Sequence, residues 1–150
     1  MASTSDIAND LNHLISLNVD ALKGYRDAGN ESDTAGLRLW MFNVQQERAH
    51  FVAELQQIVR SLGHTPEDDG SFLGKLHRAW IDIKGEMTDE VNEEMIEECI
   101  RGEEKAVEDY RKVLDHDLTP EARGVIQKQL DQIHADLLKL NQMERALDRD

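Results

Sequence analysis

Apolar residues recur at intervals of three and four along four long stretches of this chain. In the first stretch, which starts at TSDIANDL, Ile7, Leu11 and Leu14 are separated by polar residues. This spacing gives a helix one apolar face and one polar face. Ser5 or Asp6 can cap the amino-terminal end of this helix, and the segment DAGNESDTAG is rich in residues that end helices.

The second stretch predicts a helix that begins near Asp33 or Thr34 and ends near Gly63, a residue type that favours helix ends. In the middle of its apolar face the helical repeat passes through Glu47 or Arg48, and the spacing alone leaves both open. The apolar positions of this face are Leu37, Met41, Val44, Phe51, Leu55, Ile58 and Leu62.

Two further helices are expected in the second half of the chain. The third begins near Thr88 and ends in the segment DHDLTP. The fourth has Thr119 as its expected N-cap and Pro120 at its first helical position, where proline is favoured. Its apolar positions alternate three and four apart and predict a deeply buried face: Ile126, Leu130, Ile133, Leu137, Leu140 and Leu147.

The lengths of the connections predict the topology. Short loops join helices one and two and helices three and four, so each pair is expected to form an antiparallel hairpin. The longer link carries its own short apolar stripe, which includes Trp80, and predicts a small helix over residues 71–85. Two hairpins and one long crossover predict an all-α, ferritin-like antiparallel four-helix bundle, with residues 1–150 as a single domain.

Composition and charge narrow the classes of function. Apolar residues make up 39% and charged residues 32% of the chain, and there are only two prolines, which suits a helical bundle. The net charge of −14 argues against a nucleic-acid surface and against an anionic membrane surface. No signal peptide or membrane span is visible and there is one cysteine, so a cytoplasmic protein is expected.

A metal site is the most specific chemical hypothesis. Dinuclear iron or manganese sites in such bundles take one Glu from each of two helices and a Glu-x-x-His pair from each of the other two. The second helix offers Glu47 with His50, and the third offers Glu103 at an inward position. The fourth offers Asp131 with His134, the same spacing with a shorter carboxylate. Together these residues predict a metal site in the bundle core.

Two departures from the pattern keep a second interpretation open. The first helix offers the uncharged Asn18 where a Glu is expected. With 31 acidic residues and six histidines, a Glu-x-x-His match also arises easily by chance. In the alternative, Arg48 or Arg101 forms a buried salt bridge with Glu47 or Glu103. A third interpretation, intermediate between these two, is a degenerate metal site that holds a single ion.

A short internal repeat links the first and third helices. Asn18 precedes Tyr25 by seven residues, and Glu103 precedes Tyr110 by the same interval, two helical turns along one face. Asn18, Tyr25 and Tyr110 are therefore expected beside the candidate metal ligands. Gly102 costs a helix about 1 kcal/mol relative to alanine, which predicts a neighbouring helix or an ion close to it.

Three segments resemble a known family: GSFLGKLHRAWIDIKG, ECIRGEEKAVEDYRKVL and GYRDAG. They look like a bacterial family of ferritin-like four-helix-bundle proteins of unknown function, within the superfamily that includes rubrerythrin-like proteins. The resemblance implies the fold, and it suggests stress-related iron chemistry. Glu47, His50 and Glu103 match the ligand types of such proteins, whereas Asn18 and Asp131 do not. A ferritin storage cage is not expected, because only RALDRD follows the fourth helix.

Two hypotheses for function follow, and whether the protein is an enzyme is left open. In the first, the bundle binds iron or manganese through Glu47, His50, Glu103, Asp131 and His134 and has a stress-related role. In the second, the bundle is free of metal and acts as a structural or protein-interaction module. In that case it forms a homodimer through Trp40 and the crossover segment 71–85.

Overall fold

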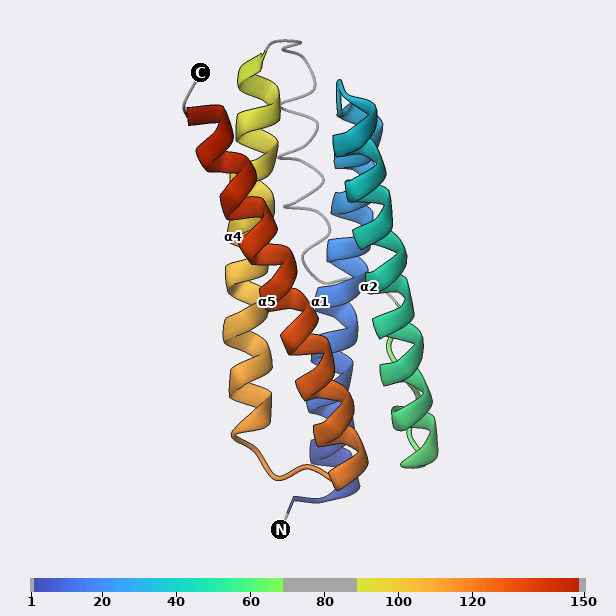
Figure 1. Ribbon diagram of the computed structural model, residues 1–150. Helices are drawn as coiled ribbons and strands as arrows, with labels where there is room; N and C mark the ends of the chain where they lie inside the picture. Colours follow the sequence, from blue (N-terminus) through green and yellow to red (C-terminus); the bar gives the residue numbers. More distant parts are fainter. Residues whose placement is uncertain (1, 69–88, 149–150) are drawn as a thin grey trace.

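Four long helices make up the part of the chain that the structure, a computed structural model, describes: residues 2–68 and 89–148. They are α1 (Thr4–Glu31), α2 (Ala35–Ser61), α4 (Asp89–Leu114) and α5 (Pro120–Asp148). The helices α1 and α2 form one antiparallel hairpin, and α4 and α5 form a second beside it (Figure 1). This confirms the expected all-α bundle. The short helix expected over residues 71–85 lies outside the described residues.

The amino-terminal cap of α1 differs from the sequence-based expectation. The cap is Ser3 rather than Ser5 or Asp6. The Ser3 hydroxyl accepts a hydrogen bond from the Asp6 backbone N–H at 3.1 Å, and the Asp6 carboxylate accepts one from the Ser3 backbone N–H at 3.3 Å. This reciprocal pair satisfies two backbone donors at once, so the helix starts one turn earlier than a cap at Asp6 would allow.

Three other expected helix ends are confirmed, whereas the start expected near Thr88 lies outside the described residues. Thr34 caps α2 by accepting a hydrogen bond from the Leu37 N–H at 3.3 Å. Thr119 caps α5 in the same way, accepting from the Ala122 N–H at 3.1 Å. Gly63 follows the end of α2 with a φ of 82°, a conformation that costs glycine little and other residues much more. These local signals fix the lengths of the helices and therefore which residues lie at the same level.

The core consists of two clusters of buried apolar side chains, one toward each end of the bundle. Representative members are Leu11, Leu55 and Ile133 in the first cluster, and Met41, Met95 and Leu140 in the second. On α2 the clusters meet between Val44 and Phe51, on α5 between Ile133 and Leu140, and on α4 between Ile100 and Ala106. The polar site described below lies at this boundary, at mid-height of the bundle.

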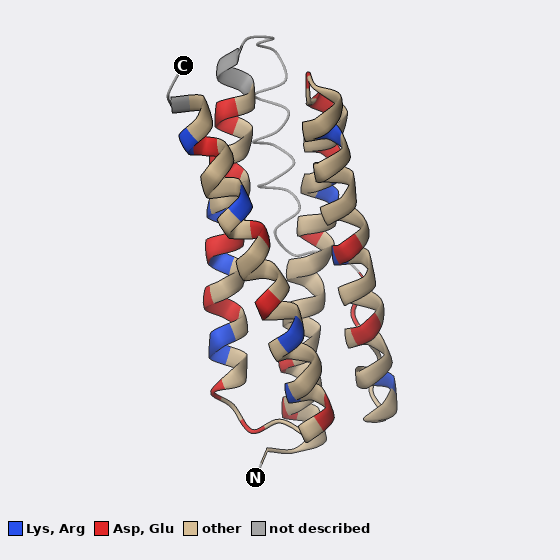
Figure 2. Ribbon diagram, in the orientation of Figure 1, with Lys and Arg blue, Asp and Glu red and all other residues tan. Residues whose placement is uncertain are grey.

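Charged residues occur along the length of all four helices (Figure 2). Four acidic residues are buried, and the others whose burial the structure describes are partly or fully exposed; the buried ones are Asp20, Glu103, Asp109 and Asp136. Within residues 2–68 and 89–148, no helix combines the length and the apolar character needed to cross a membrane.

Candidate functional site

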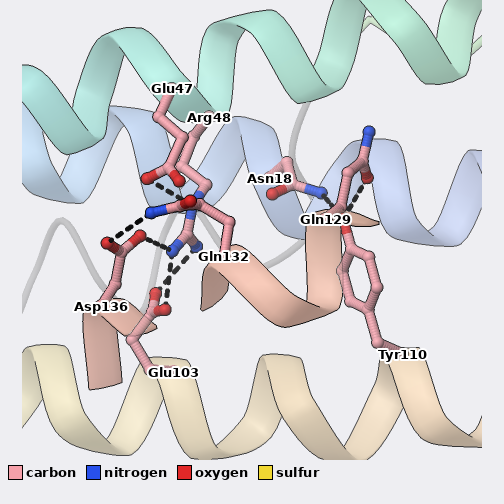
Figure 3. Close-up of polar contacts among 8 residues, drawn as sticks. All are labelled: Asn18, Glu47, Arg48, Glu103, Tyr110, Gln129, Gln132 and Asp136. Atoms are coloured by element: carbon pink, nitrogen blue, oxygen red, sulfur yellow. Dashed lines mark hydrogen bonds and ion pairs between the residues drawn. The ribbon is translucent and has the colours of Figure 1, made fainter. Parts of the chain in front are cut away.

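A buried arginine stands at the centre of the bundle. The side chain of Arg48 on α2 is 0% exposed. Its two terminal nitrogens donate to the two carboxylate oxygens of Glu103 on α4, at 2.9 and 2.7 Å (Figure 3). One of these nitrogens also donates to Asp136 on α5, at 2.9 Å. A planar guanidinium is well suited to such two-pronged binding of a carboxylate, so three helices are joined through one side chain.

Aromatic rings complete the surroundings of the guanidinium. Its central carbon lies 5.8 Å from the ring centroid of Tyr25 on α1 and 5.6 Å from that of Phe51 on α2. Both distances fall in the range of cation–π contacts. Burial disfavours the charged form of Arg48, but the adjacent carboxylate of Glu103 favours it, and the pKa of Arg48 lies above its ordinary value. The arginine therefore remains a cation in the core.

Glu47 is the third carboxyl group of this network. Its carboxylate lies 3.9 Å from Nε of Arg48, and its side chain is only 19% exposed. Burial, a hydrogen bond with Asp136 and the negative charges of Asp136 and Glu103 raise the pKa of Glu47 to about 9, although Arg48 acts in the opposite direction. The balance of these effects favours the neutral, protonated form of Glu47. Glu47 is therefore the member of the network that carries the proton at neutral pH.

The charge balance of the network follows from these contacts. One cation, Arg48, faces three carboxyl groups, those of Glu47, Glu103 and Asp136. With Glu47 protonated, one net negative charge is left in the cluster. Gln132 approaches Asp136 with its side-chain amide at 3.5 Å and adds a further, weak donor. We name these residues the Arg48 network: Glu47, Arg48, Glu103, Gln132 and Asp136.

A second polar chain lies next to the Arg48 network, toward the first apolar cluster. Asn18 on α1 donates to the hydroxyl of Tyr110 on α4 at 2.7 Å, and this hydroxyl donates to Gln129 on α5 at 2.7 Å (Figure 3). Gln129 in turn donates to the backbone carbonyl of Phe51 on α2 at 3.3 Å. Burial raises the pKa of Tyr110, so its hydroxyl remains a donor. Hydrogen bonds thus connect all four helices at this level, and they connect three helices at the adjacent level of Arg48.

The five predicted metal ligands do not meet at one point. Glu47 and Glu103 lie together, but the guanidinium of Arg48 lies with them. His50 and Asp131 are exposed, and Asp131 accepts a hydrogen bond from Gln127 at 3.0 Å. His134 is half-buried at a surface hollow between α4 and α5, alongside residues such as Glu104 and Arg111.

These positions do not fit a dinuclear centre. Each Glu-x-x-His helix must turn both its carboxylate and its imidazole inward, and here His50 and Asp131 face water. A guanidinium also already holds Glu103 and Asp136 by hydrogen bonds. Among the residues that the structure describes, no group of three or more His, Cys, Asp or Glu side chains is placed to hold a metal ion. The alternative expectation, a buried salt bridge between Arg48 and Glu103, is confirmed.

Two buried residues of these polar layers, Asp136 and Gln129, were not predicted from the sequence, although the apolar spacing of α5 indicates both. Asp136 lies three residues after Ile133 and four before Leu140, and Gln129 lies three after Ile126 and four before Ile133. Both therefore interrupt the strongest apolar face of the chain, and both are buried. Interruption of an apolar face is also what placed Glu103 inside the bundle. On α5, however, Asp131 was chosen as the inward carboxylate because it lies three residues before His134.

Two smaller expectations have different outcomes. The internal repeat of α1 and α4 has a structural counterpart, since Asn18 contacts Tyr110, the tyrosine of the opposite repeat. Gly102 has no close neighbour among the described residues. A Cβ at Gly102 would meet no described atom within 4 Å, so none of the four described helices makes the expected close approach, and an ion beside Gly102 stays a prediction. Gly102 instead borders an open space between α1 and α4.

The topology and this polar core define the class of protein, a ferritin-like four-helix bundle. The fold is similar to that of a two-domain protein from Anabaena variabilis with DJ-1/ThiJ/PfpI-like and ferritin-like domains, with a TM-score of 0.77 and 12% sequence identity. The likeness covers 97% of this chain but 40% of that chain, and at this identity it concerns the fold alone.

Residues 6–116 match the model of a family described as a domain of unknown function (DUF2383), and the chain belongs to this family. The resemblance to a ferritin-like family of unknown function is therefore confirmed. A search of curated proteins finds no match to this chain.

Proposed function

We propose that this protein is a ferritin-like bundle whose core works without metal, as a structural or protein-interaction module. One observation carries the proposal: the fully buried guanidinium of Arg48 binds Glu103 and Asp136 in the layer where a ferritin-like metalloprotein would bind its ions. A cation is required there to balance the buried carboxylates, and the chain supplies that cation itself.

The competing proposal is a dinuclear iron or manganese centre on Glu47, His50, Glu103, Asp131 and His134, with a stress-related role. It requires His50 and Asp131 to turn from water into the core, and it requires Arg48 to leave Glu103. A guanidinium expelled in this way loses three short hydrogen bonds and two aromatic contacts. These costs favour the metal-free module.

Thermal melts with added metal separate the two proposals. For the metal-free module we expect the melting temperature to be the same with and without ferrous iron or manganese, each added anaerobically in excess over the protein. An ion that binds only the folded state at 100 times its dissociation constant adds about 2.7 kcal/mol to the free energy of unfolding, a shift that a melt detects easily. A rise of several degrees with either ion would favour the dinuclear centre.

We propose further that the module forms a homodimer through a face that includes Trp40 and the segment 71–85. The supporting observation is Leu39, which is 62% exposed beside Trp40 on α2. Trp40 itself is half-buried, and its ring packs edge-on against Tyr25 at 6.1 Å. Aromatic residues are enriched in interfaces between chains, and an apolar contact there would remove the Leu39 side chain from water.

Sedimentation velocity tests this interface with a matched pair of variants. We expect the wild-type protein to sediment as a dimer and Leu39→Glu to sediment as a monomer, because a charge in an apolar interface must be desolvated. Leu138 on α5 is similarly exposed, at 57%, and Leu138→Glu serves as the control that remains a dimer. A monomeric wild-type protein, or a Leu39→Glu dimer of unchanged stability, would contradict the proposal.

A further inference from the structure

A pocket lies between α1 and α4, next to the Arg48 network. Its volume is about 240 Å³. Residues of α1 that line it include Leu17, Ala21 and Tyr25, and residues of α4 include Cys99 and Gly102. Arg48 and Glu103 form the side where the pocket meets the network. The pocket thus combines apolar side chains with polar and charged residues from both helices, and small-molecule sites commonly pair an apolar surface with a few polar groups.

Glycine creates part of this space. Gly24 on α1 and Gly102 on α4 both line the pocket. A Cβ at Gly102 would meet no described atom within 4 Å, so nothing in the packing requires the absence of a side chain there. An apolar cavity of about 150 Å³ is enough to bind benzene. The pocket between α1 and α4, at about 240 Å³, can therefore hold a ring together with a substituent.

Two donor atoms of residues that line the pocket make no hydrogen bond with a described residue. The hydroxyl of Tyr25 and Nε of Arg48 are buried, and neither has a hydrogen-bond partner within the described part of the chain. Burial and the charge of Glu103 raise the pKa of Tyr25, so its hydroxyl remains a hydrogen-bond donor. Nε of Arg48 is also a donor. A buried donor without an acceptor costs free energy, and a ligand that offers an acceptor would recover it.

The surroundings of the pocket disfavour both anions and covalent chemistry. Three acidic residues and three basic residues line it: Asp20, Glu98, Glu103, Arg48, Arg101 and Lys105. Each of the basic residues already has an acidic partner, which is Glu103 for Arg48, Glu98 for Arg101 and Asp109 for Lys105. Burial and the charge of Glu103 raise the pKa of Cys99, so the thiol is not present as the reactive thiolate. A ligand in this pocket is therefore held by reversible contacts, and a negative charge on it would lose its hydration without gaining an unpaired cation from these lining residues.

We propose that this pocket binds a small uncharged molecule with an apolar body and one carbonyl-type acceptor, which receives a hydrogen bond from Tyr25. This site goes beyond the proposed function, which assigns no ligand to the protein. Its ligand packs against Leu17, Ala21 and Cys99 and fills the space beside Gly102. The Arg48 network holds the wall of the pocket in place without taking part in any reaction.

Titration with three probes of equal size tests the proposed chemistry. Acetophenone carries a ring and one carbonyl, cumene has the same number of non-hydrogen atoms but no acceptor, and benzoate adds a negative charge. Binding is followed through the backbone amide resonances of Cys99 and Gly102. We expect saturable binding of acetophenone, binding of cumene weakened about fivefold by the missing hydrogen bond, and no saturable binding of benzoate. Tyr25→Phe should make acetophenone and cumene bind equally well.

Matched leucine substitutions locate the binding site. Gly102→Leu fills the pocket and is expected to weaken acetophenone binding about tenfold or more, because the space is taken up. Gly124 on α5 is exposed, and a Cβ there also meets no described atom within 4 Å, so Gly124→Leu should leave binding unchanged. Ala21→Leu fills the pocket from α1 and repeats the test if Gly102→Leu does not fold. Equal binding to wild type and to the folded pocket-filled variant, or no saturable binding of acetophenone, overturns the proposal.

Discussion

Arg48→Met is expected to lower the free energy of unfolding by about 3–5 kcal/mol at neutral pH. Methionine fits the volume of the arginine stem but carries no charge. The substitution leaves Glu103 and Asp136 buried without the guanidinium that donates three hydrogen bonds to them. Isolated buried carboxylates are far more costly than a buried ion pair, because nothing replaces the water that they lose. Urea unfolding monitored by circular dichroism measures the difference.

Arg101→Met provides the control for this prediction. Arg101 also lies in a long helix and pairs with a Glu, Glu98, but its side chain is 62% exposed. Exposed pairs of this kind contribute at most about 1 kcal/mol. We also expect manganese to raise the melting temperature of Arg48→Met but not that of the wild-type protein, since the remaining carboxylates then lack a cation. Equal stability of the two methionine variants would show that Arg48 does not hold the core together.

Glu47→Gln is expected to stabilise the protein by about 1 kcal/mol or more at pH 8 and to have little effect at pH 5. The pKa of Glu47 is raised from its ordinary value of 4.5 to about 9 in the folded protein. The unfolded chain therefore releases this proton as the pH rises above about 4.5, while the folded protein keeps it. Folding at higher pH must take up a proton, so the stability due to Glu47 falls steadily between these two values.

Glutamine reproduces the protonated carboxyl without this dependence on pH. Its amide can still donate to Asp136, and it has no proton to lose. Unfolding measured at intervals from pH 5 to pH 9 should therefore give a flatter profile for Glu47→Gln than for the wild-type protein. Glu104→Gln, at an exposed position on α4, is the control and should leave the wild-type profile unchanged. Parallel profiles for wild type and Glu47→Gln would mean that Glu47 is ionised in the folded state.

The bundle could be predicted from the sequence because its signals are local. The apolar spacing defines each helix, and Thr34, Gly63 and Thr119 define helix ends within a residue of the structure. The same spacing placed Glu103 inside the bundle, where it is 2% exposed. A charged residue at such a position must have a partner, and this requirement was also evident from the sequence.

The identity of the partner could not be predicted, because it depends on contacts between helices. Glu47 and Arg48 lie three and four residues after Val44, and either can follow it on the apolar face. Arg48 occupies that position in the structure because Glu103 and Asp136 reach it from two other helices. Residues two apart are separated by about 200° around a helix axis, so an inward Arg48 turns His50 to the opposite face. Because Arg48 points inward, His50 cannot join Glu47 as a metal ligand in the core.

The metal content of the purified protein tests most directly whether Arg48 takes the place of metal ions in this core. The protein is produced without a histidine tag in cells supplied with iron and manganese, and its metals are measured by elemental analysis. We expect far less than one ion per chain, because the Arg48 guanidinium already binds Glu103 and Asp136 in the layer where ferritin-like metalloproteins bind their ions. About two iron or manganese ions per chain, the number found in dinuclear bundles, would contradict the proposal that Arg48 takes the place of metal ions.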